Sequence, residues 1–268
     1  MITGINIFRN CIENGYPFVE AILSVYPLVD EFLLNDGGST DGTLEALHRL
    51  EAEYPKIRVY TIPDTPNIRW DSCSNQINQL IKQACGEYIY LGNADELLHE
   101  EDIKDITKFI YENDWPVVRY QRREISSTWS KLSDEVYHPA RTVKNYDELR
   151  QDWNAYGGDE FLVGSDWWID PDRRLQSPYI IYHLYNVFPG NMNNKRRNDA
   201  EYLAPGDKQR VKSYDLLKDN VYSYQKPEYV MAGLPALCYG LTYMETYRVR
   251  EELFDVEYVE ELCSLNYK

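Results

Sequence analysis

The chain has 268 residues, 43% of them hydrophobic, and a formal net charge of −16 from 44 acidic and 28 basic side chains. The length suits one large α/β domain, alone or with an appendage, and the apolar content argues against wholesale disorder. An acidic chain is repelled by phosphate backbones unless its basic residues cluster. The only compact basic cluster in the sequence is Lys195-Arg196-Arg197, so we expect no nucleic-acid partner.

Cysteine usage and hydropathy bear on the location of the protein. The five cysteines are scattered and lack C-x-x-C spacing, which indicates neither a disulfide framework nor a zinc site. This pattern is typical of a reducing cytosol, so we expect a cytoplasmic protein. The longest apolar region, residues 18–29, is interrupted by Glu20 and Pro27 and is too short to cross a membrane. Any contact with a membrane would therefore be peripheral, at its surface.

Strands and amphipathic helices alternate over the first 115 residues. Strands are predicted at 5–8, 32–34, 57–62 and 88–91, and helices at 16–26, 44–50, 77–84 and 103–110, with Asp41 as the N-cap of the second helix. This alternation predicts an α/β fold with a mainly parallel central sheet and helices on both faces. Ligands bind such sheets beyond the carboxyl ends of the strands. Asp36 and residues 93–96 both follow predicted strands.

The alternation weakens after Trp115. Strands are predicted at 117–123 and 180–185, the Trp-, Asp- and Gly-rich stretch 153–172 is predicted to be mostly loop, and the tail is predicted to be helical around 245–252 and again from 257. We therefore predict a main α/β domain at 1–206. A mostly helical C-terminal extension, 207–268, is predicted to pack on the same domain.

Residues 36–43 read DGGSTDGT and join a predicted strand to a predicted helix. Glycines allow close backbone approach, hydroxyls offer hydrogen-bond donors, and the helix N-terminus favours a bound anion. The segment resembles the donor-site signature of family 2 glycosyltransferases, which have the Rossmann-like GT-A fold. The resemblance implies that Asp36 contacts the base and ribose of a nucleotide donor and that Gly38 lies against it. A capped turn without a ligand is the alternative interpretation.

Residues 84–96, ACGEYIYLGNADE, resemble the family segment that ends in a metal-binding D-x-D motif. The resemblance implies that Asp95 is the main ligand of Mn²⁺ or Mg²⁺, a cation that neutralises the diphosphate leaving group. Asn93 and Ala94 would lie against the donor. The family usually has Asp where this chain has Asn93, and Glu96 is a candidate to compensate for the missing charge. An acidic helix start is the alternative.

Five other positions are weaker donor-binding candidates. Phe8 and Asn10 occupy the place of the family's T-Y-N segment, although Phe8 departs from the usual Thr. Gln76 and Asn78 lie in a segment that resembles the family's S-x-Q-x-N. Arg69, just upstream, is a candidate for contact with the donor phosphates or base.

Residues 139–144, PARTVK, resemble the p-x-R-L-F-R segment of one family branch, which includes relatives acting on lipopolysaccharide core sugars. In that branch an acidic pair and an aromatic-flanked histidine follow. Here Asp159-Glu160 and then His183 follow, so the resemblance spans roughly residues 3–186. It implies His183 as a metal ligand or phosphate contact, with a packed strand-end histidine as the alternative.

Family 2 enzymes are generally inverting, which the resemblance implies here. A carboxylate then takes the proton from the acceptor hydroxyl, and Glu160 is the first candidate for this base and Asp159 the second. Rival carboxylates in the same stretch are Asp166, Asp170 and Asp172. Lys195 is a candidate to clamp the donor diphosphate from a loop, with a solvated basic turn as the alternative.

The sequence thus predicts transfer of a sugar from a nucleotide diphosphate donor to a hydroxyl of a saccharide or glycolipid, assisted by a metal. Two alternatives stay open. A sugar-phosphate nucleotidyltransferase has a related architecture, but its glycine-rich loop with Arg and Lys is missing after the first strand. A non-catalytic relative that binds nucleotide or sugar is compatible with Asn93.

Overall fold

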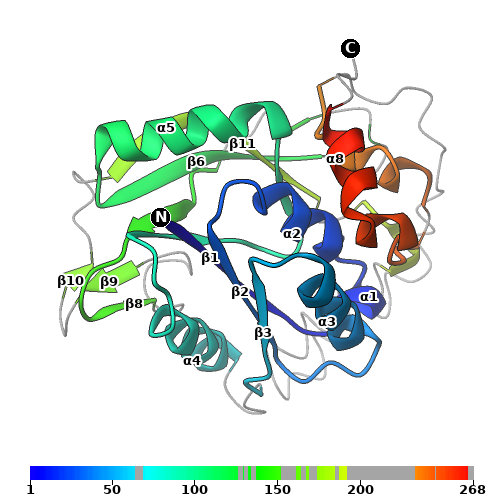
Figure 1. Ribbon diagram of the computed structural model, residues 1–268, viewed down its shortest axis with the longest axis horizontal. Coiled ribbons are helices and arrows are strands. Elements are labelled where there is room, and N and C mark those ends of the chain that lie inside the picture. Colours follow the sequence, from blue (N-terminus) through cyan, green and yellow to red (C-terminus); the bar gives the residue numbers. More distant parts are fainter. Residues whose placement is uncertain are drawn as a thin grey trace, which may run out of the picture.

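The computed structural model describes residues 1–63, 69–125, 129, 132–133, 137–151, 161–163, 167–168, 174–184, 187–191, 233–244 and 246–264. An eight-stranded sheet with the order β3-β2-β1-β4-β7-β6-β11-β5 forms its centre, and a three-stranded sheet has the order β10-β9-β8 (Figure 1). The strands are β1 (Ile2–Phe8), β2 (Glu31–Asp36), β3 (Ile57–Tyr60), β4 (Tyr88–Leu91), β5 (Glu96–Leu98), β6 (Val117–Glu124), β7 (Ala140–Lys144), β8 (Leu149–Gln151), β9 (Phe161–Val163), β10 (Trp167–Trp168) and β11 (Arg174–His183).

Helices connect and cover these strands. The α-helices are α1 (Cys11–Asn14), α2 (Phe18–Val25), α3 (Thr43–Glu53), α4 (Arg69–Ile81), α5 (Ile103–Asn113) and α8 (Val256–Ser264). The 3-10 helices are η1 (Glu100–Asp102), η3 (Pro189–Asn191), η5 (Ala236–Cys238), η6 (Leu241–Tyr243) and η7 (Glu251–Phe254). None of the helices in the described ranges is both long and apolar enough to span a bilayer.

The central sheet is mixed. Strands β3, β2, β1 and β4 are parallel neighbours, as are β6 and β11, whereas β7 runs antiparallel to β4 and β6, and β5 runs antiparallel to β11. The predicted α/β architecture is confirmed, with its longest parallel run confined to the first half of the chain. The carboxyl ends of β1, β2 and β4 consequently meet at one edge.

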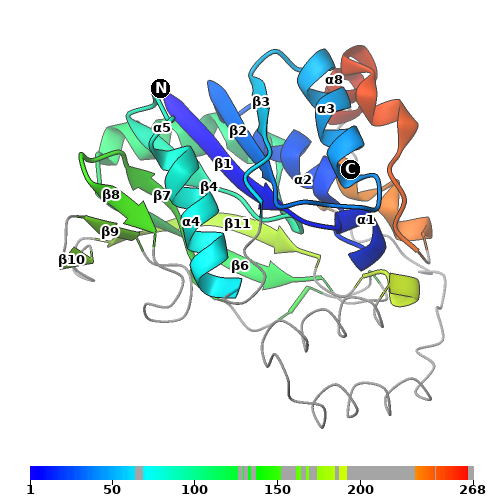
Figure 2. The same ribbon diagram turned by 90° about the horizontal axis from the view of Figure 1, so that it is seen from below.

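Both faces of the sheet are covered, as predicted. Along β1, Ile5 packs in one hydrophobic cluster with Ile77 and Leu80 of α4, while Ile2 and Phe8 pack in a second cluster on the other face. Successive side chains of a strand point to opposite faces, which explains the division. The second cluster receives the buried sides of α2, α3 and α5, so α4 alone of these four helices covers the first face (Figure 2).

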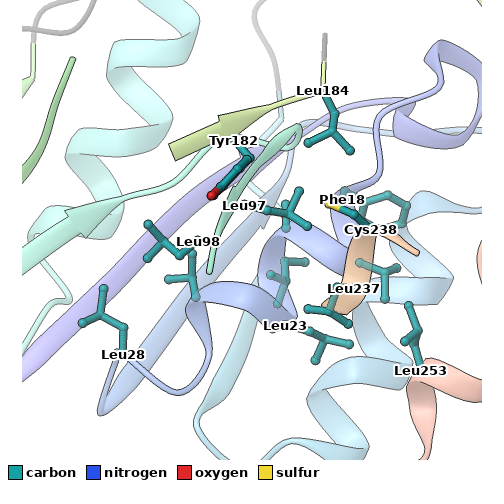
Figure 3. Close-up of a cluster of buried hydrophobic side chains, with 14 of the residues drawn as sticks. Phe18, Leu23, Leu28, Leu97, Leu98, Tyr182, Leu184, Leu237, Cys238 and Leu253 are labelled. Carbon is teal, nitrogen blue, oxygen red and sulfur yellow. The ribbon is translucent and has the colours of Figure 1, made fainter. Parts of the chain in front are cut away.

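The C-terminal part of the chain belongs to the larger of these clusters. Leu237 and Cys238 of η5 and Leu253 of η7 are buried with Phe18 and Leu23 of α2 (Figure 3). Hydrogen bonds add to this apolar contact, since the Tyr54 hydroxyl donates to the Leu253 carbonyl at 2.7 Å. The tail over 233–264 therefore shares one core with the sheet. The predicted domain boundary at 206 lies outside the described residues and stays a prediction.

Two local predictions differ from the structure. Residues 153–172 were predicted to be mostly loop, but they contain β9 and β10, which pair antiparallel with each other, and β9 pairs with β8. Asp41 was predicted as the N-cap of α3, but Gly42 holds that position, with φ at 96°. Asp41 instead accepts hydrogen bonds from Thr43, two residues later, and from the Glu13 amide at 2.8 Å. Its carboxylate thus ties two helix starts together.

Glu20 is a buried carboxyl at the junction of α2 with the C-terminal part. The Tyr247 hydroxyl donates to it at 3.1 Å, and an Arg250 nitrogen lies 4.0 Å away. Burial raises the pKa of Glu20 from its ordinary 4.5 to about 7, although Arg250 opposes the rise. The folded chain thus holds this proton more tightly than the unfolded chain. The stabilising contribution is complete below pH 4.5 and is lost as the pH rises toward 7.

We expect Glu20→Gln to remove that pH dependence. A rise in pKa from 4.5 to about 7 corresponds to about 3 kcal/mol, so the variant should gain up to about this much unfolding free energy relative to the parent between pH 5 and pH 8. Urea unfolding of both proteins at several pH values measures the difference. Two parallel stability curves would contradict the prediction.

Candidate active site

The first motif forms a tight turn where β1 and β2 end side by side. Phe8 and Asp36 are register partners, and the Gly37 amide donates to the Phe8 carbonyl at 2.8 Å. One Asp36 carboxylate oxygen, Oδ2, accepts the amides of Gly38 and Ser39, each at 2.8 Å. These bonds fix the direction of the carboxylate by local hydrogen bonding, as an Asp at the start of a turn often does.

The other Asp36 oxygen is left over. Oδ1 is buried and has no hydrogen-bond partner among the described residues, and the whole side chain is 1% exposed. A buried acceptor without a partner is costly and calls for a physical explanation. A ligand N–H or O–H group would satisfy it. The orphan oxygen is therefore the strongest local sign that this turn receives a polar ligand.

Asn10 completes the turn from the β1 side. Its backbone is left-handed, with φ at 48°, a conformation that Asn tolerates better than most residues. Its amide donates to the Ser39 hydroxyl at 2.8 Å, and its side-chain oxygen accepts from the Thr40 amide at 2.9 Å. Phe8 behaves differently, since its ring is buried against Phe18 in the core. A contact of Phe8 with a donor would have to come from its backbone.

The second motif follows β4 and leads into β5. Asp95 is 5% exposed, and its Oδ2 lies 3.5 Å from Nε2 of His183, the last residue of β11. The antiparallel pairing of β5 with β11 sets this approach, because Glu96 and His183 are register partners. The other ring nitrogen of His183 lies 3.5 Å from a carboxylate oxygen of Glu124, which ends β6. The imidazole thus lies between the carboxylate of Asp95, just before β5, and that of Glu124, at the end of β6.

The charges of this cluster perturb each other. Burial alone would lower the pKa of His183, but the carboxylates of Asp95 and Glu124 raise it to about 9. His183 in turn holds the pKa of Glu124 below its usual value. Perturbed titratable groups that gather at one place are typical of functional sites.

Glu96 is occupied by a different partner. Arg141 of β7 forms a two-pronged ion pair with it, with Nε 2.8 Å from one carboxylate oxygen and Nη2 2.9 Å from the other. Both side chains are almost fully buried. Although burial would raise the pKa of Glu96, the Arg141 guanidinium holds it below its usual value. The idea that Glu96 replaces the missing metal-binding carboxylate at position 93 is therefore not supported by its surroundings.

The two motifs converge around the end of β1, which lies between β2 and β4 in the sheet. The pairing of β1 with β4 extends into the second motif, because the Gly92 amide donates to the Ile5 carbonyl at 2.9 Å. Cys11, just after β1, is close enough to both motifs for their carboxylates to affect its pKa. Burial raises the pKa of its thiol, and the carboxylates of Asp36 and Asp95 add to that rise.

Among the described residues, Asp95 and His183 are the two candidate metal ligands that lie together. Asp95 and His183 offer a carboxylate oxygen and an imidazole nitrogen, ligands that Mn²⁺ accepts. Across the described ranges, no group of three or more His, Cys, Asp or Glu side chains is arranged to hold a metal ion. A divalent cation here would need further ligands, which diphosphate oxygens can supply. The donor set fits a cation that binds together with a nucleotide.

Two weaker candidates on α4 have structural partners. The Gln76 side-chain oxygen accepts from Asn35 of β2 at 2.6 Å. The side-chain amide of Asn78 pairs with the backbone of Gln151 in β8. Its nitrogen donates to the Gln151 carbonyl at 2.9 Å, and its oxygen accepts from the Gln151 amide at 2.7 Å. These bonds fasten α4 to both sheets, and the predicted donor roles stay untested. Arg69 begins α4, and its side chain is outside the described part.

Several predicted residues lie outside the described ranges. They include both base candidates, Glu160 and Asp159, and the diphosphate candidate Lys195. Ala94 lies within the β4–β5 connection and is partly buried against the core.

Sequence reasoning assigned no role to Arg141 or Glu124. Arg141 lay in a segment that resembles a family motif, and this was a usable signal, because an Arg inside an apolar strand requires a buried partner. Glu124 gave no signal, since its importance comes only from the pairing of β6 with β11.

Comparisons with known proteins bear on the family of the chain. The model of the family "Glycosyl transferase family 2" matches residues 7–164, more than half of the 268-residue chain. No curated protein sequence matches the chain. The chain is also similar to crystal structures of S. aureus TarS. The structure of TarS 1–349 has a TM-score of 0.48 and 15% identity, over 83% of this chain and 72% of that one.

Two structures of the same protein with ligands are similar as well. TarS 1–349 in complex with UDP has a TM-score of 0.46 and 16% identity, over 81% of this chain and 71% of that one. TarS 1–349 in complex with UDP-GlcNAc has a TM-score of 0.45 and 14% identity, over 79% and 68%. The mixed sheet with helices on both faces is a GT-A architecture. With its two motifs at one sheet edge and the family model matched over most of the sheet, the chain belongs to glycosyl transferase family 2.

Proposed function

We propose that this chain transfers a sugar from a nucleotide diphosphate donor to a hydroxyl group of a saccharide or glycolipid acceptor. The observation that carries the proposal is the buried Asp36 Oδ1, which has no partner in the described part of the chain and lies in a turn at the same sheet edge as Asp95. A nucleoside offers N–H and O–H groups for such an acceptor, and a diphosphate with its cation suits the neighbouring carboxylate and imidazole. Family membership supports the same reaction class.

The roles within the site follow from this geometry. Asp95 and His183 would hold Mn²⁺ or Mg²⁺ together with the diphosphate, and such a cation supplies neutralisation of the leaving group's charge. Asp36, Gly38 and Asn10 would bind the nucleoside. The reaction would invert the anomeric centre, with Glu160 or Asp159 taking the proton from the acceptor hydroxyl. We also propose that the chain is related to the family branch that acts on lipopolysaccharide core sugars.

The experiment is a thermal-shift screen of UDP, GDP and dTDP, each with Mn²⁺, with Mg²⁺ and with a chelator. A ligand that binds only the folded chain raises the melting temperature. At a ligand concentration 100-fold above the Kd, the free energy of unfolding rises by about 2.7 kcal/mol. We expect one nucleotide with metal to give a clear shift. Because only two protein ligands lie together, the metal alone should give a much smaller one.

Donor-hydrolysis assays separate the alternatives. Slow release of a nucleoside diphosphate from its sugar, dependent on metal, supports the transferase. Pyrophosphate release from a nucleoside triphosphate with a sugar phosphate supports a nucleotidyltransferase, and binding without turnover supports a non-catalytic relative. Absence of any nucleotide-dependent shift would contradict the whole proposal.

A further inference from the structure

Asn93 stands where the family usually has a carboxylate, and the structure supplies a physical reason for the amide. Its Nδ2 donates to the Glu96 Oε1 at 3.1 Å. Both carboxylate oxygens of Glu96 already accept hydrogen bonds from the Arg141 guanidinium, so Glu96 acts as an acceptor here. The amide nitrogen of Asn93 must therefore face Glu96. Its carbonyl oxygen is directed elsewhere, and the side chain is only partly buried.

An Asp at position 93 would meet Glu96 as a like charge. Two carboxylates at this distance repel each other and have no N–H donor between them, so the new side chain would have to turn away from Glu96. Arg141 could not relieve the conflict, because both carboxylate oxygens of Glu96 already accept from its guanidinium. Arg122 also donates to Glu96 Oε1, at 3.5 Å, so this oxygen already has a second arginine as a partner.

The contacts form a continuous chain from the sheet to the site. Arg141 lies on β7, Glu96 begins β5, and Asn93 sits in the connection that also carries Asp95. The Arg141 guanidinium also donates to the Ala140 carbonyl at 3.2 Å, so its position is fixed by its own strand. A planar guanidinium with several bonds holds its partner in one orientation, which a lysine ammonium cannot do.

We propose that Arg141 and Glu96 are positioning residues that orient the Asn93 amide, so that its oxygen accepts a hydrogen bond from a hydroxyl of the bound nucleotide or its sugar. This inference rests on the proposed function. It assigns the buried ion pair a task beyond stability and makes the neutral side chain at position 93 a requirement of this site.

The test measures nucleotide affinity in folded variants. The probe is whichever of UDP, GDP and dTDP with Mn²⁺ stabilises the parent most, and its Kd is measured by calorimetry well below each variant's melting temperature. We expect Arg141→Lys to keep the charge, lose the two-pronged geometry and weaken binding about tenfold, since a hydrogen bond to a charged group contributes this order of energy.

Arg250→Lys is the matched control. Arg250 is also a buried arginine, which donates to the Leu237 carbonyl at 3.1 Å and pairs with Glu252, both in the C-terminal part. We expect this variant to lower the melting temperature and leave the nucleotide Kd unchanged. Equal weakening by both lysine variants would show a general loss of rigidity and overturn the inference, as would an unchanged Kd in Arg141→Lys.

Asn93→Asp tests the charge argument directly, and its partly exposed position favours folding of the variant. We expect binding about tenfold weaker than in the parent, without recovery at higher Mn²⁺ concentration. Equal or tighter binding would overturn the inference alone. A parent chain that binds none of the three nucleotides would overturn the proposed function and this inference with it.

Discussion

Asp95→Asn is expected to reduce sugar transfer by about 10²–10³-fold while the chain stays folded, a loss typical of removing one electrostatic group from a catalytic centre. The substitution keeps the shape of the side chain and removes its charge. Asp95 is nearly buried and lies 3.5 Å from His183, so no other described carboxylate can take its place without moving. Glu96 is held by Arg141, and Glu124 lies on the opposite side of the imidazole.

The measurement pairs the transfer rate with the metal-dependent part of the nucleotide thermal shift. Both should fall together, whereas the shift by nucleotide in the presence of a chelator should remain, because Asp36 and Asn10 are unchanged. Asp114→Asn is the matched control, since Asp114 contacts Tyr88 and Lys144 at the start of β4, away from the site. An Asp95→Asn enzyme with parental rate and metal response would remove Asp95 from the proposed site.

Arg141→Met is expected to lower the free energy of unfolding by about 3–5 kcal/mol, because it leaves the Glu96 carboxylate buried without its partner. The side chain of Arg141 is fully buried and that of Glu96 is 1% exposed, so water cannot replace the lost bonds without rearrangement. Such a loss is a large fraction of the 5–15 kcal/mol that typically separates folded from unfolded domains.

Denaturant unfolding of the single and double variants tests this expectation. The double variant Glu96→Gln with Arg141→Met contains no buried charge at the pair and should recover part of the stability, since replacing both members of a buried pair is often nearly neutral. A double variant as unstable as the sum of the two single variants would mean that the charges do not interact. That result would also weaken the positioning role inferred for Arg141.

Strand β4 was predictable because its side chains are apolar on both faces. Tyr88–Leu91 was predicted with the bounds that β4 has, and all four residues are buried. The antiparallel β7 and β5 were harder. β5 is three residues long, and its place at the far edge of the sheet depends on a partner, β11, that begins about eighty residues later. The small sheet of β8, β9 and β10 was missed because its strands, like β5, are only two or three residues long.

The local part of the turn at Asp36 was predictable, because the bonds from the Gly38 and Ser39 amides to Asp36 join residues two and three positions apart. Its bonds to Asn10 join residues about thirty positions apart and were not predicted. The contacts of Asp95 were not predictable locally either. Its juxtaposition with His183 was expected only from the resemblance to a family. Neither the place of Glu124 beside His183 nor the ion pair of the adjacent Glu96 with Arg141 was expected. Each of these contacts joins strands that are distant in the sequence, and no local pattern encodes their register.

The sequence by itself determined the α/β class, the acidic turn after β2 and the family, since short-range periodicity, glycine placement and local hydrogen bonding are written in adjacent residues. Only the tertiary structure decided which carboxylates are available to a ligand. Asp36 keeps one oxygen without a partner, whereas Glu96 is neutralised by Arg141. The availability of a buried charge depends on the groups that surround it in space, and for Glu96 those groups arrive from a strand more than forty residues away.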